Sequence, residues 1–370
     1  MSADQAAERK TPLAAKLAAR IRQEGPVSVA DYMRACLNDP EHGYYRKRAA
    51  IGRGGDFITA PEISQVFGEL IGLWCAVVWQ QMGAPASVRL IELGPGRGTL
   101  MRDTLRAARA DPAFRAALDV GLIESNATLE AMQRASLAGE DVPIRWSADI
   151  ASGESPAPTI VVANEFLDTL PVAQWVFRAG RWHHRCVGLG DTGGLSFVTG
   201  EADASIAQPA QEGDILESRA PALAEWANKL AFGAPLAALF IDYGHPEPAL
   251  GDTLQAVTAH RYGDPLRAPG EADLSAQVDF AGVADAMHRY DLACDGPVPQ
   301  AHFLAALGIV ERASHLMAAN PLKAAVIEAG VARLMAPTGM GTRFCALGVR
   351  SESVAPLPGF EAVDSERRAP

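Results

Sequence analysis

The segment at residues 90–98 has the residue types and spacing of a ligand-binding turn. A strand-like apolar run containing Glu92 is followed by three glycines at alternate positions. Glycine lets a backbone turn sharply and approach a ligand closely, which dinucleotides and S-adenosylmethionine both require. A dinucleotide fingerprint expects glycine where this chain has Thr99, and an apolar residue in place of Glu92. We therefore expect an S-adenosylmethionine site in which Glu92 meets the cationic amino group. The turn residues at the cofactor would be Gly94, Pro95, Gly96 and Gly98.

Polar residues also follow the next two predicted strands. The strand at 119–124 ends in Glu124, where an open α/β sheet places the acid that holds a ribose diol, and Ser125 is beside it. The strand at 143–147 leads to Asp149 and Ile150, which we expect at the adenine amino group and ring. Asp149 is equally consistent with a surface residue of a turn.

A carboxylate pair follows the fourth predicted strand. The apolar run at 160–163 leads to Asn164, Glu165 and Asp168. The carboxyl ends of parallel strands meet at one edge of a sheet, so we expect Asn164 to contact the cofactor and both carboxylates to lie beside it. A carboxylate directly after a buried strand is costly without a partner, which favours a functional Glu165. Asp168 could equally cap a helix.

His245 follows the fifth predicted strand, at 236–242, and would reach the same edge. Imidazole accepts a proton near neutral pH, so His245 is a candidate proton acceptor. The alternative is a structural histidine in a Gly-Pro turn.

A glycine-containing loop at 51–61 precedes the sheet pattern. Its glycines would allow it to fold over the cofactor, where the hydroxyl of Thr59 or of nearby Ser64 could donate to the cofactor carboxylate. The alternative is a loop that only joins the first helices to the sheet.

The elements that position these residues form an α/β pattern. Short apolar runs alternate with helical segments from residue 88, which indicates a parallel sheet with crossover helices. We predict a class I, Rossmann-like methyltransferase fold with a mostly parallel seven-stranded sheet. An N-terminal helical extension and covering loop would occupy residues 1–85 and the methyltransferase domain residues 86–350. That domain would contain an antiparallel β insertion at about 172–235, and a loose tail would follow at 351–370.

Helix boundaries and the remaining strands follow from caps and turns. Thr11, Pro12 and Gly25 delimit a first helix, and Ser28 with Asp31 opens a second that runs to about residue 37. A third is predicted at 62–82. Three strands at 173–178, 181–189 and 195–199 form the insertion, and a long loop after residue 242 leads to a last strand at 342–350.

Composition excludes several classes of protein. A formal charge of −11 disfavours a nucleic-acid substrate, which needs a concentrated cationic surface. The five cysteines are scattered and contain no Cys-x-x-Cys pair, so we expect no metal site. The apolar runs are too short for a membrane-spanning helix. The N-terminus has no apolar signal core and contains Asp4 and Glu8, from which we expect a cytoplasmic location.

Four ordered motifs give the chain a specific resemblance. The runs at 55–70, 92–100, 164–172 and 241–245 resemble the MidA family, which includes a mitochondrial complex I assembly methyltransferase. The likeness extends from about residue 11 to 350 and adds residues 268–274 and 296–300. The departures are mild: Leu167 stands where a second Phe is common, and Asn126 where Pro is frequent.

The resemblance implies S-adenosylmethionine-dependent arginine methylation, symmetric in product, of a quinone-side NADH dehydrogenase subunit. A guanidinium is protonated at physiological pH and presents a planar fork of donors, for which paired carboxylates are a natural clamp. Glu165 would then be the principal orienting group and Asp168 its helper. Two alternatives remain open at this point: an assembly chaperone that binds the cofactor without turnover, and a methyltransferase for a small molecule.

Overall fold

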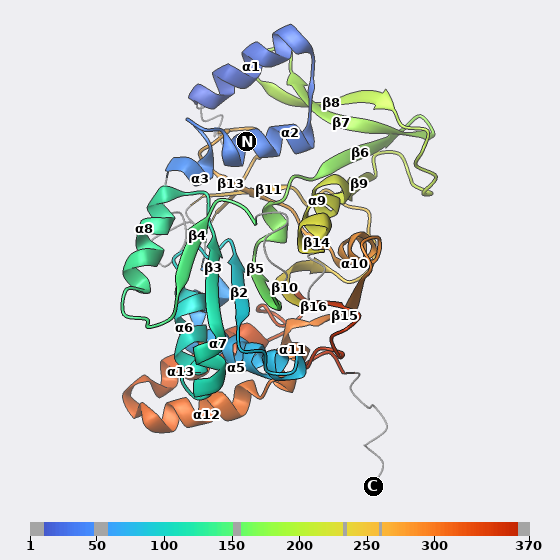
Figure 1. The fold of residues 1–370 in the computed structure, drawn as a ribbon. Coiled ribbons are helices and arrows are strands. Elements are labelled where there is room, and N and C mark those ends of the chain that lie inside the picture. The colour runs from blue at the N-terminus through green and yellow to red at the C-terminus, as the bar shows by residue number, and fades with distance from the viewer. Residues whose placement is uncertain (1–10, 48–57, 151–156, 232–234, 259–260, 362–370) are drawn as a thin grey trace.

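A mostly parallel sheet of eight strands forms the centre of the protein (Figure 1). The computed structural model describes residues 11–47, 58–150, 157–231, 235–258 and 261–361. Seven strands lie in the order β15 (Leu292–Pro299), β16 (Phe344–Ser351), β10 (Leu236–His245), β5 (Thr159–Asn164), β2 (Val88–Leu93), β3 (Leu118–Ile123) and β4 (Ile144–Ser147), and β14 (Val278–Asp279) pairs with β10.

Parallel pairing brings the carboxyl ends of five strands to one edge. β4, β3, β2, β5 and β10 pair in parallel, and β16 runs antiparallel to both of its neighbours. β5 is buried along its whole length, as expected for an inner strand with both faces covered. The segments that follow β2, β3, β5 and β10 therefore meet along the edge where open α/β sheets bind ligands.

Helices cover both faces of the sheet. One face packs against α5 (Gln65–Gln81) and α6 (Thr99–Ala108), and the other against α9 (Ala220–Leu230) and α10 (Phe280–His288). α5 and α6 approach closely because Gly72 has no side chain: a Cβ there would lie 2.7 Å from the carbonyl oxygen of Thr104. Further helices are α4 (Ala60–Ile63), α7 (Pro112–Ala117), α8 (Ala127–Ser136), α11 (Gln300–Ala306), α12 (Ile309–Ala319) and α13 (Ala324–Met335).

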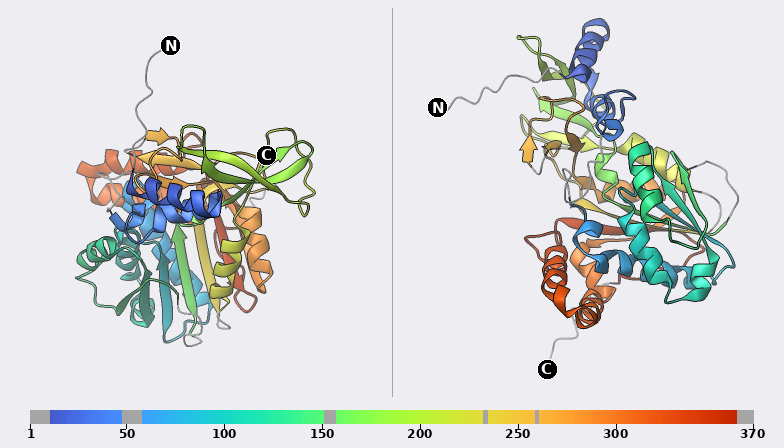
Figure 2. Two further views of the ribbon diagram at one scale, coloured as in Figure 1. Left: turned by 90° about the horizontal axis from the view of Figure 1, so that it is seen from above. Right: turned by 90° about the vertical axis from the view of Figure 1, so that its left-hand side faces the viewer.

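A layer with its own apolar core lies over the carboxyl edge of the sheet (Figures 1 and 2). The Arg46 side chain of this layer donates a 2.7 Å hydrogen bond to the carbonyl oxygen of Ser125, just after β3. The layer contains α1 (Pro12–Glu24), α2 (Val29–Asn38), α3 (Tyr44–Lys47), a sheet of β1 (Val27–Ser28), β6 (Ala173–Arg178), β7 (Arg181–Leu189), β8 (Leu195–Ala202) and β9 (Ile215–Ser218), and a sheet of β11 (Gln255–Thr258), β12 (Arg261–Gly263) and β13 (Asp273–Ser275).

The first two helices begin and end as the sequence predicts. The Thr11 hydroxyl accepts a hydrogen bond from the amide of Ala14 at 3.0 Å, and Gly25 ends α1 with φ +89°. The Ser28 hydroxyl accepts from the amide of Asp31 at 3.0 Å and donates to its carboxylate at 2.8 Å. The single helix predicted at 62–82 is wrong, because the chain is extended at Ser64, which ends α4 and caps α5.

Two other predictions need correction. The long loop expected after residue 242 contains β11 to β15 and α10 to α13. β15 escaped detection because Pro297 and Pro299 argue against a strand, yet this strand lies at the end of the sheet, where proline is tolerated. The tail is not loose over residues 352–361: Val354 and Leu357 are buried in the main core, and the indole of Trp74 donates to the carbonyl oxygen of Pro358.

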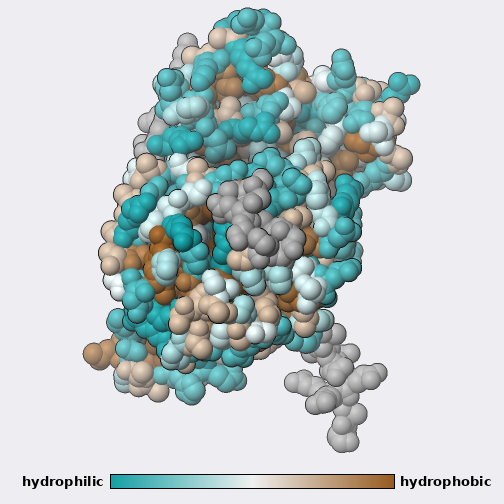
Figure 3. Space-filling model, viewed as in Figure 1, coloured by the Kyte–Doolittle hydropathy of each residue, from teal (hydrophilic) through white to brown (hydrophobic). Residues whose placement is uncertain are grey.

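The N-terminal segment also divides differently from the predicted extension at 1–85. α1 and α2 pack in the upper layer, whereas α5 packs with the sheet. Within the described part of the chain, no helix is both long and apolar enough to cross a membrane. Figure 3 shows hydrophobic side chains in small separate areas among hydrophilic ones on the face drawn in Figure 1.

Candidate active site

The turn after β2 encloses a small cavity. Gly94, Gly96 and Gly98 have φ angles of +61°, +54° and +75°, values that strain any residue with a side chain. At Gly94 an added Cβ would lie 3.2 Å from the ring of Phe166. The backbone conformation predicted for this turn is therefore present. Residues from three parts of the chain line the cavity, among them Thr59, Glu92, Gly94, Pro95, Gly96, Asn164 and Glu165.

Glu92 places a carboxylate in this cavity. Its side chain is 3% exposed, and its Oε2 has no hydrogen-bond partner among the described residues. Burial raises the pKa of Glu92 to about 8, a hydrogen bond from the Met101 amide opposes the shift, and the nearby charge of Glu124 adds to it. A buried carboxylate with a free oxygen is stabilised by a cation, so this site fits the ammonium group of an amino acid.

Glu124 stands at the end of β3, where the sequence placed it. Its carboxylate accepts hydrogen bonds from the amide of Asn126 at 2.7 Å and from the Gln133 side chain at 3.1 Å. Gln133 also donates to the carbonyl oxygen of Gly96 at 2.8 Å. Burial raises the pKa of Glu124. Gln133 thus links the predicted ribose acid to the glycine turn.

Glu165 occupies a strained turn directly after β5. Its φ of +52° lies in the left-handed region that a non-glycine residue rarely adopts. Its Oε1 accepts hydrogen bonds at 3.2 Å from the amide of Ala60 and from the side chain of Asn164. Burial and the neighbouring charge of Asp168 raise the pKa of Glu165 to about 7. The carboxyl group can therefore change its protonation state near neutral pH.

Asp242 at the end of β10 holds this turn in place. Its Oδ2 accepts hydrogen bonds from three consecutive amides of the turn, at residues 166, 167 and 168, at 2.8–3.1 Å. Its Oδ1 accepts from the amide of Tyr243 at 2.9 Å. Burial raises the pKa of Asp242, and the charges of Asp168 and Glu165 raise it further. The strained backbone at Glu165 is thus supported by a carboxylate from the neighbouring strand.

Asp168 is buried beside Glu165, near a buried arginine. Arg219 is 5% exposed and donates to four backbone carbonyl oxygens, among them those of Asp168 and Leu170. Burial raises the pKa of Asp168 to about 6, and the charge of Arg219 opposes that shift. Asp168 Oδ1 has no hydrogen-bond partner among the described residues. The structure thus brings the two predicted carboxylates together, but of the two only Glu165 lines the small cavity.

A second, larger cavity also borders Glu165. Its volume is about 650 Å³, and it lies between the end of β10, the β11–β12 hairpin and the segment from the end of α13 to the start of β16. Its side chains include Tyr243, Gln255, Tyr262, Arg333 and Arg343. Glu165 therefore lines both the small cavity and the larger one.

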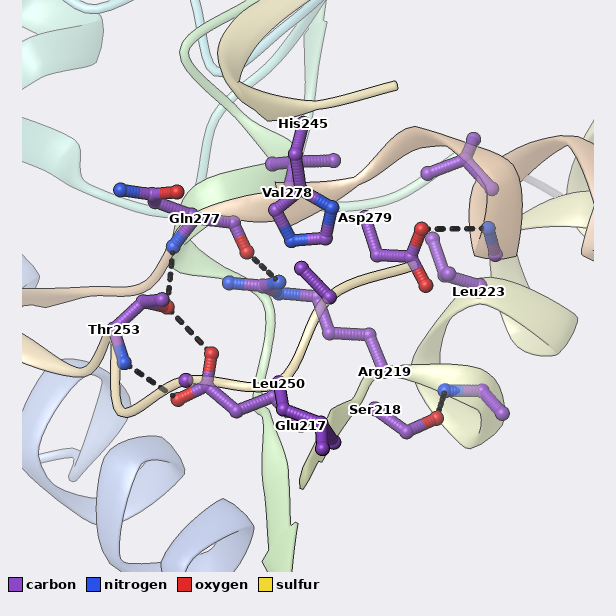
Figure 4. A pocket seen from close by; sticks show the side chains of 15 residues that line it. Glu217, Ser218, Arg219, Leu223, His245, Leu250, Thr253, Gln277, Val278 and Asp279 are labelled. Carbon is purple, nitrogen blue, oxygen red and sulfur yellow. Dashed lines mark hydrogen bonds between the residues drawn. The ribbon is translucent and has the colours of Figure 1, made fainter. Parts of the chain in front are cut away.

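His245 lies elsewhere. It lines a third cavity of about 140 Å³ together with Glu217, Arg219 and Val278 (Figure 4). Its Nδ1 is 2.5 Å from the carbonyl oxygen of Glu247. β10 extends beyond the edge of the sheet and pairs with β14 at this point. His245 therefore lies beyond the larger cavity. The expectation that His245 shares a site with Glu165 is therefore not met.

Six predicted cofactor residues do not line the small cavity: Ser64, Gly98, Glu124, Ser125, Asp149 and Ile150. Asp149 forms an ion pair with Lys229 of α9 at 2.8 Å, and Ile150 packs in the core beside the sheet. Both line a separate cavity along β2, β3 and β4. The Ser64 hydroxyl accepts from the amide of Val66 at 3.3 Å, a helix cap. Position after a strand therefore did not determine the direction in which these side chains point.

Sequence reasoning missed the residues that support the site. Gln133 and Arg219 act through hydrogen bonds to backbone segments 37 or more positions away, and no local motif marks either one. Asp242 was expected to reach the same edge of the sheet, and it is the last buried residue of β10, but its role in holding the turn at Glu165 was not predicted. The same cost of burying an unpaired carboxylate would have predicted a partner for it.

The comparisons with known proteins agree with this geometry. The model of a family of S-adenosyl-L-methionine-dependent methyltransferases matches residues 70–298. The chain belongs to this family. A crystal structure from Burkholderia thailandensis with S-adenosyl-homocysteine bound is 28% identical, with a TM-score of 0.84, over 94% of this chain and 93% of that one. The cofactor is therefore S-adenosylmethionine, for which the glycine turn and the unpaired oxygen of Glu92 provide a suitable site.

Curated relatives extend the match over most of the chain. A Drosophila melanogaster protein named as a mitochondrial protein arginine methyltransferase NDUFAF7 homolog is 34% identical, over 90% of this chain and 83% of its own length. The Homo sapiens protein arginine methyltransferase NDUFAF7, also named as mitochondrial, is 32% identical over 90% and 82%. These findings confirm the MidA-like family. They contradict the expected cytoplasmic location, because the N-terminal charge pattern was an insufficient basis for assigning a compartment.

Proposed function

We propose that this methyltransferase modifies an arginine side chain of a partner protein, and that Glu165 is the group that orients the acceptor. The observation that carries the proposal is the position of Glu165 between the cofactor cavity and the larger cavity. The names of the curated relatives support arginine as the acceptor. The volume of the larger cavity, about 650 Å³, is sufficient for an arginine side chain.

The acceptor that we propose is a subunit of NADH dehydrogenase, with symmetric dimethylarginine as the product. This assignment rests on the resemblance of residues 164–172 and 241–245 to the MidA family. We also assign the fold to class I, because the order and direction of β4, β3, β2, β5, β10, β16 and β15 suit that class.

The residues that line the small cavity, together with Glu124, would hold the cofactor. Glu92 would bind its amino group, Glu124 its ribose, and the turn from Gly94 to Gly98 would allow its close approach. Thr59 and Asn164 line the same cavity and offer a hydroxyl and an amide. When bound, S-adenosylmethionine supplies an electrophilic methyl group on a sulfonium.

Glu165 would orient the acceptor guanidinium. Its ionised carboxylate can accept two N–H hydrogen bonds and fix one nitrogen toward the small cavity. The acceptor nitrogen must lose a proton around the transfer, and a carboxyl group with a pKa of about 7 can accept it. The charge of Asp168 helps to keep the pKa of Glu165 raised, and Asp242 holds the backbone of this turn.

The test is mass spectrometry of the NADH dehydrogenase complex from cells with and without this protein. We expect one arginine to lose its symmetric dimethylation when the protein is absent and to regain it when the protein is restored. An identical methylation pattern in both cell lines would refute the acceptor assignment. Labelled cofactor and the purified subunit would then show whether any transfer to protein occurs.

A further inference from the structure

The acceptor cavity contains two positive charges that the proposed chemistry does not explain. Arg333 and Arg343 both line it, and both are exposed. Glu165 is the single acidic residue among the described residues that line this cavity. An arginine acceptor is itself cationic, so two arginines at its entrance would oppose its binding unless the same segment brings a negative charge.

A second feature of Arg333 and Arg343 is that neither has an ion-pair partner among the described residues. Within the described residues, the side chains of Arg333 and Arg343 form no ion pair and no hydrogen bond, although the charge of Arg333 lowers the pKa of Glu165. Nearby arginines behave differently: Arg312 and Arg106 both pair with the buried Glu69. The two cations of the cavity are therefore available to a ligand.

The fold holds the backbone of both arginines firmly. Arg333 lies in the last turn of α13, and α13 packs so closely on the α4 segment that a Cβ at Gly330 would lie 3.1 Å from the carbonyl oxygen of Ile63. The carbonyl oxygen of Arg343 accepts a 3.1 Å hydrogen bond from the amide of Gly244, at the end of β10. Two separate elements thus hold their cations at one cavity.

We infer that the acceptor is an arginine with acidic residues close to it in sequence. This inference rests on the proposed arginine acceptor and names the class of peptide that the site selects. The acceptor guanidinium meets Glu165 at the inner end of the cavity, while its acidic neighbours meet Arg333 and Arg343 nearer to solvent. The chain as a whole carries a formal charge of −11, so an acidic peptide needs such a local cationic site.

Matched synthetic peptides test the inference with the full-length protein. Each peptide carries one central arginine among glycine and serine, flanked on both sides by Glu, by Gln or by Lys. Transfer of labelled methyl groups gives kcat and KM for each. We expect kcat/KM to be highest for the Glu peptide and lowest for the Lys peptide. The ratio of kcat/KM for the Glu peptide to kcat/KM for the Gln peptide should be up to about fivefold for each exposed charge pair, and the difference should lie in KM.

Charge reversal at the two arginines should reverse the preference. We expect the double variant R333E/R343E to favour the Lys peptide over the Glu peptide. The single variants R333Q and R343Q should each remove part of the preference, which provides a test if the double variant folds poorly. R181E is the matched control, because Arg181 is exposed at the tip of the β6–β7 hairpin, and it should leave the preference unchanged.

The outcomes separate this inference from the function on which it rests. Equal kcat/KM for the three peptides would refute the acidic flank and leave arginine methylation intact. Loss of S-adenosylhomocysteine affinity in R333Q or R343Q, measured by calorimetry, would assign the cation to the cofactor and also refute the inference. Label on none of the peptides, with S-adenosylhomocysteine affinity intact, would refute the proposed acceptor and with it the acidic flank.

Discussion

Glu92, which is buried, and Glu165, which is half-buried, both lie near the ends of neighbouring parallel strands, yet the structure positions them in different ways. Glu92 is the second-last residue of the regular strand β2, and the turn after it depends on three glycines at alternate positions. Glu165 has a strained backbone whose turn is held by Asp242, 77 positions further along the chain. The turn beside Glu92 is therefore local in sequence, whereas the turn at Glu165 requires a partner strand.

The largest expected effect is that of Gly96→Val on the turn beside Glu92. At φ +54° a β-branched residue is strained, and its side chain would enter the cavity. We expect S-adenosylhomocysteine affinity to fall by more than about 100-fold in calorimetry. Gly139→Ala is the matched control, since Gly139 has open space around it and an ordinary φ. Retained affinity in the valine variant would mean that the cofactor does not approach this turn.

Glu165→Gln tests the turn at Glu165 directly. The amide keeps the size of the side chain but cannot accept a proton or balance a guanidinium charge. We expect kcat for methyl transfer to fall about 100-fold, with S-adenosylhomocysteine affinity unchanged within about threefold. Glu352→Gln, at an exposed carboxylate, controls for the change of charge. A normal rate in the Gln variant would remove Glu165 from the mechanism.

Asp242→Ala tests whether the turn at Glu165 needs its partner strand. The substitution leaves two buried and two part-buried amides without their acceptor, so we expect the free energy of unfolding to fall by about 3 kcal/mol in a denaturant titration. In the folded fraction we expect transfer to fall by about tenfold while cofactor affinity holds, because the backbone at Glu165 can relax. Asp242→Asn retains one acceptor oxygen and should lose less stability. An equal loss of cofactor affinity in the Ala and Asn variants would show that the cofactor and acceptor parts of the site depend on each other.

The two carboxylates should also respond to pH separately. We expect transfer to increase by up to about tenfold as pH rises through about 7, where Glu165 ionises, and cofactor affinity to increase up to about pH 8, where Glu92 ionises. The free energy of unfolding changes with pH in the opposite direction. Because the folded pKa of Glu165 exceeds its usual 4.5, the folded state binds more protons between about pH 4.5 and 7, and the free energy of unfolding falls as pH rises across that window.

Kinetics and calorimetry across pH 5.5–9 check both profiles. Glu165→Gln should abolish the inflection in transfer near pH 7 and leave the affinity profile unchanged. A single shared inflection in both measurements would show that the two carboxylates titrate as one unit.

The sequence allowed prediction of the features that depend on neighbouring residues. The glycine turn, the caps of α1 and α2, and the strands of the parallel sheet follow from short patterns that tertiary contacts did not override. β15 did not, because its prolines are acceptable only at the end of a sheet. The position of His245 depends on how far β10 extends beyond β16. Arg219 was unpredictable because its partners are carbonyl groups of two separate segments, residues 168–170 and 276–277, which only the fold brings together.

The position of Glu165 in the lining of both cavities has a consequence for the order of events in turnover. A cation in the small cavity favours the ionised form of Glu165, and that form is the one that binds the acceptor. The cationic cofactor and the acceptor should therefore bind cooperatively, each raising the affinity of the other by the same factor. Transfer converts the sulfonium to a neutral thioether, so the cooperativity disappears once the reaction is complete, and the modified protein is released. Acceptor affinity measured with a cofactor analogue that carries an amine in place of the sulfonium should accordingly exceed that measured with S-adenosylhomocysteine.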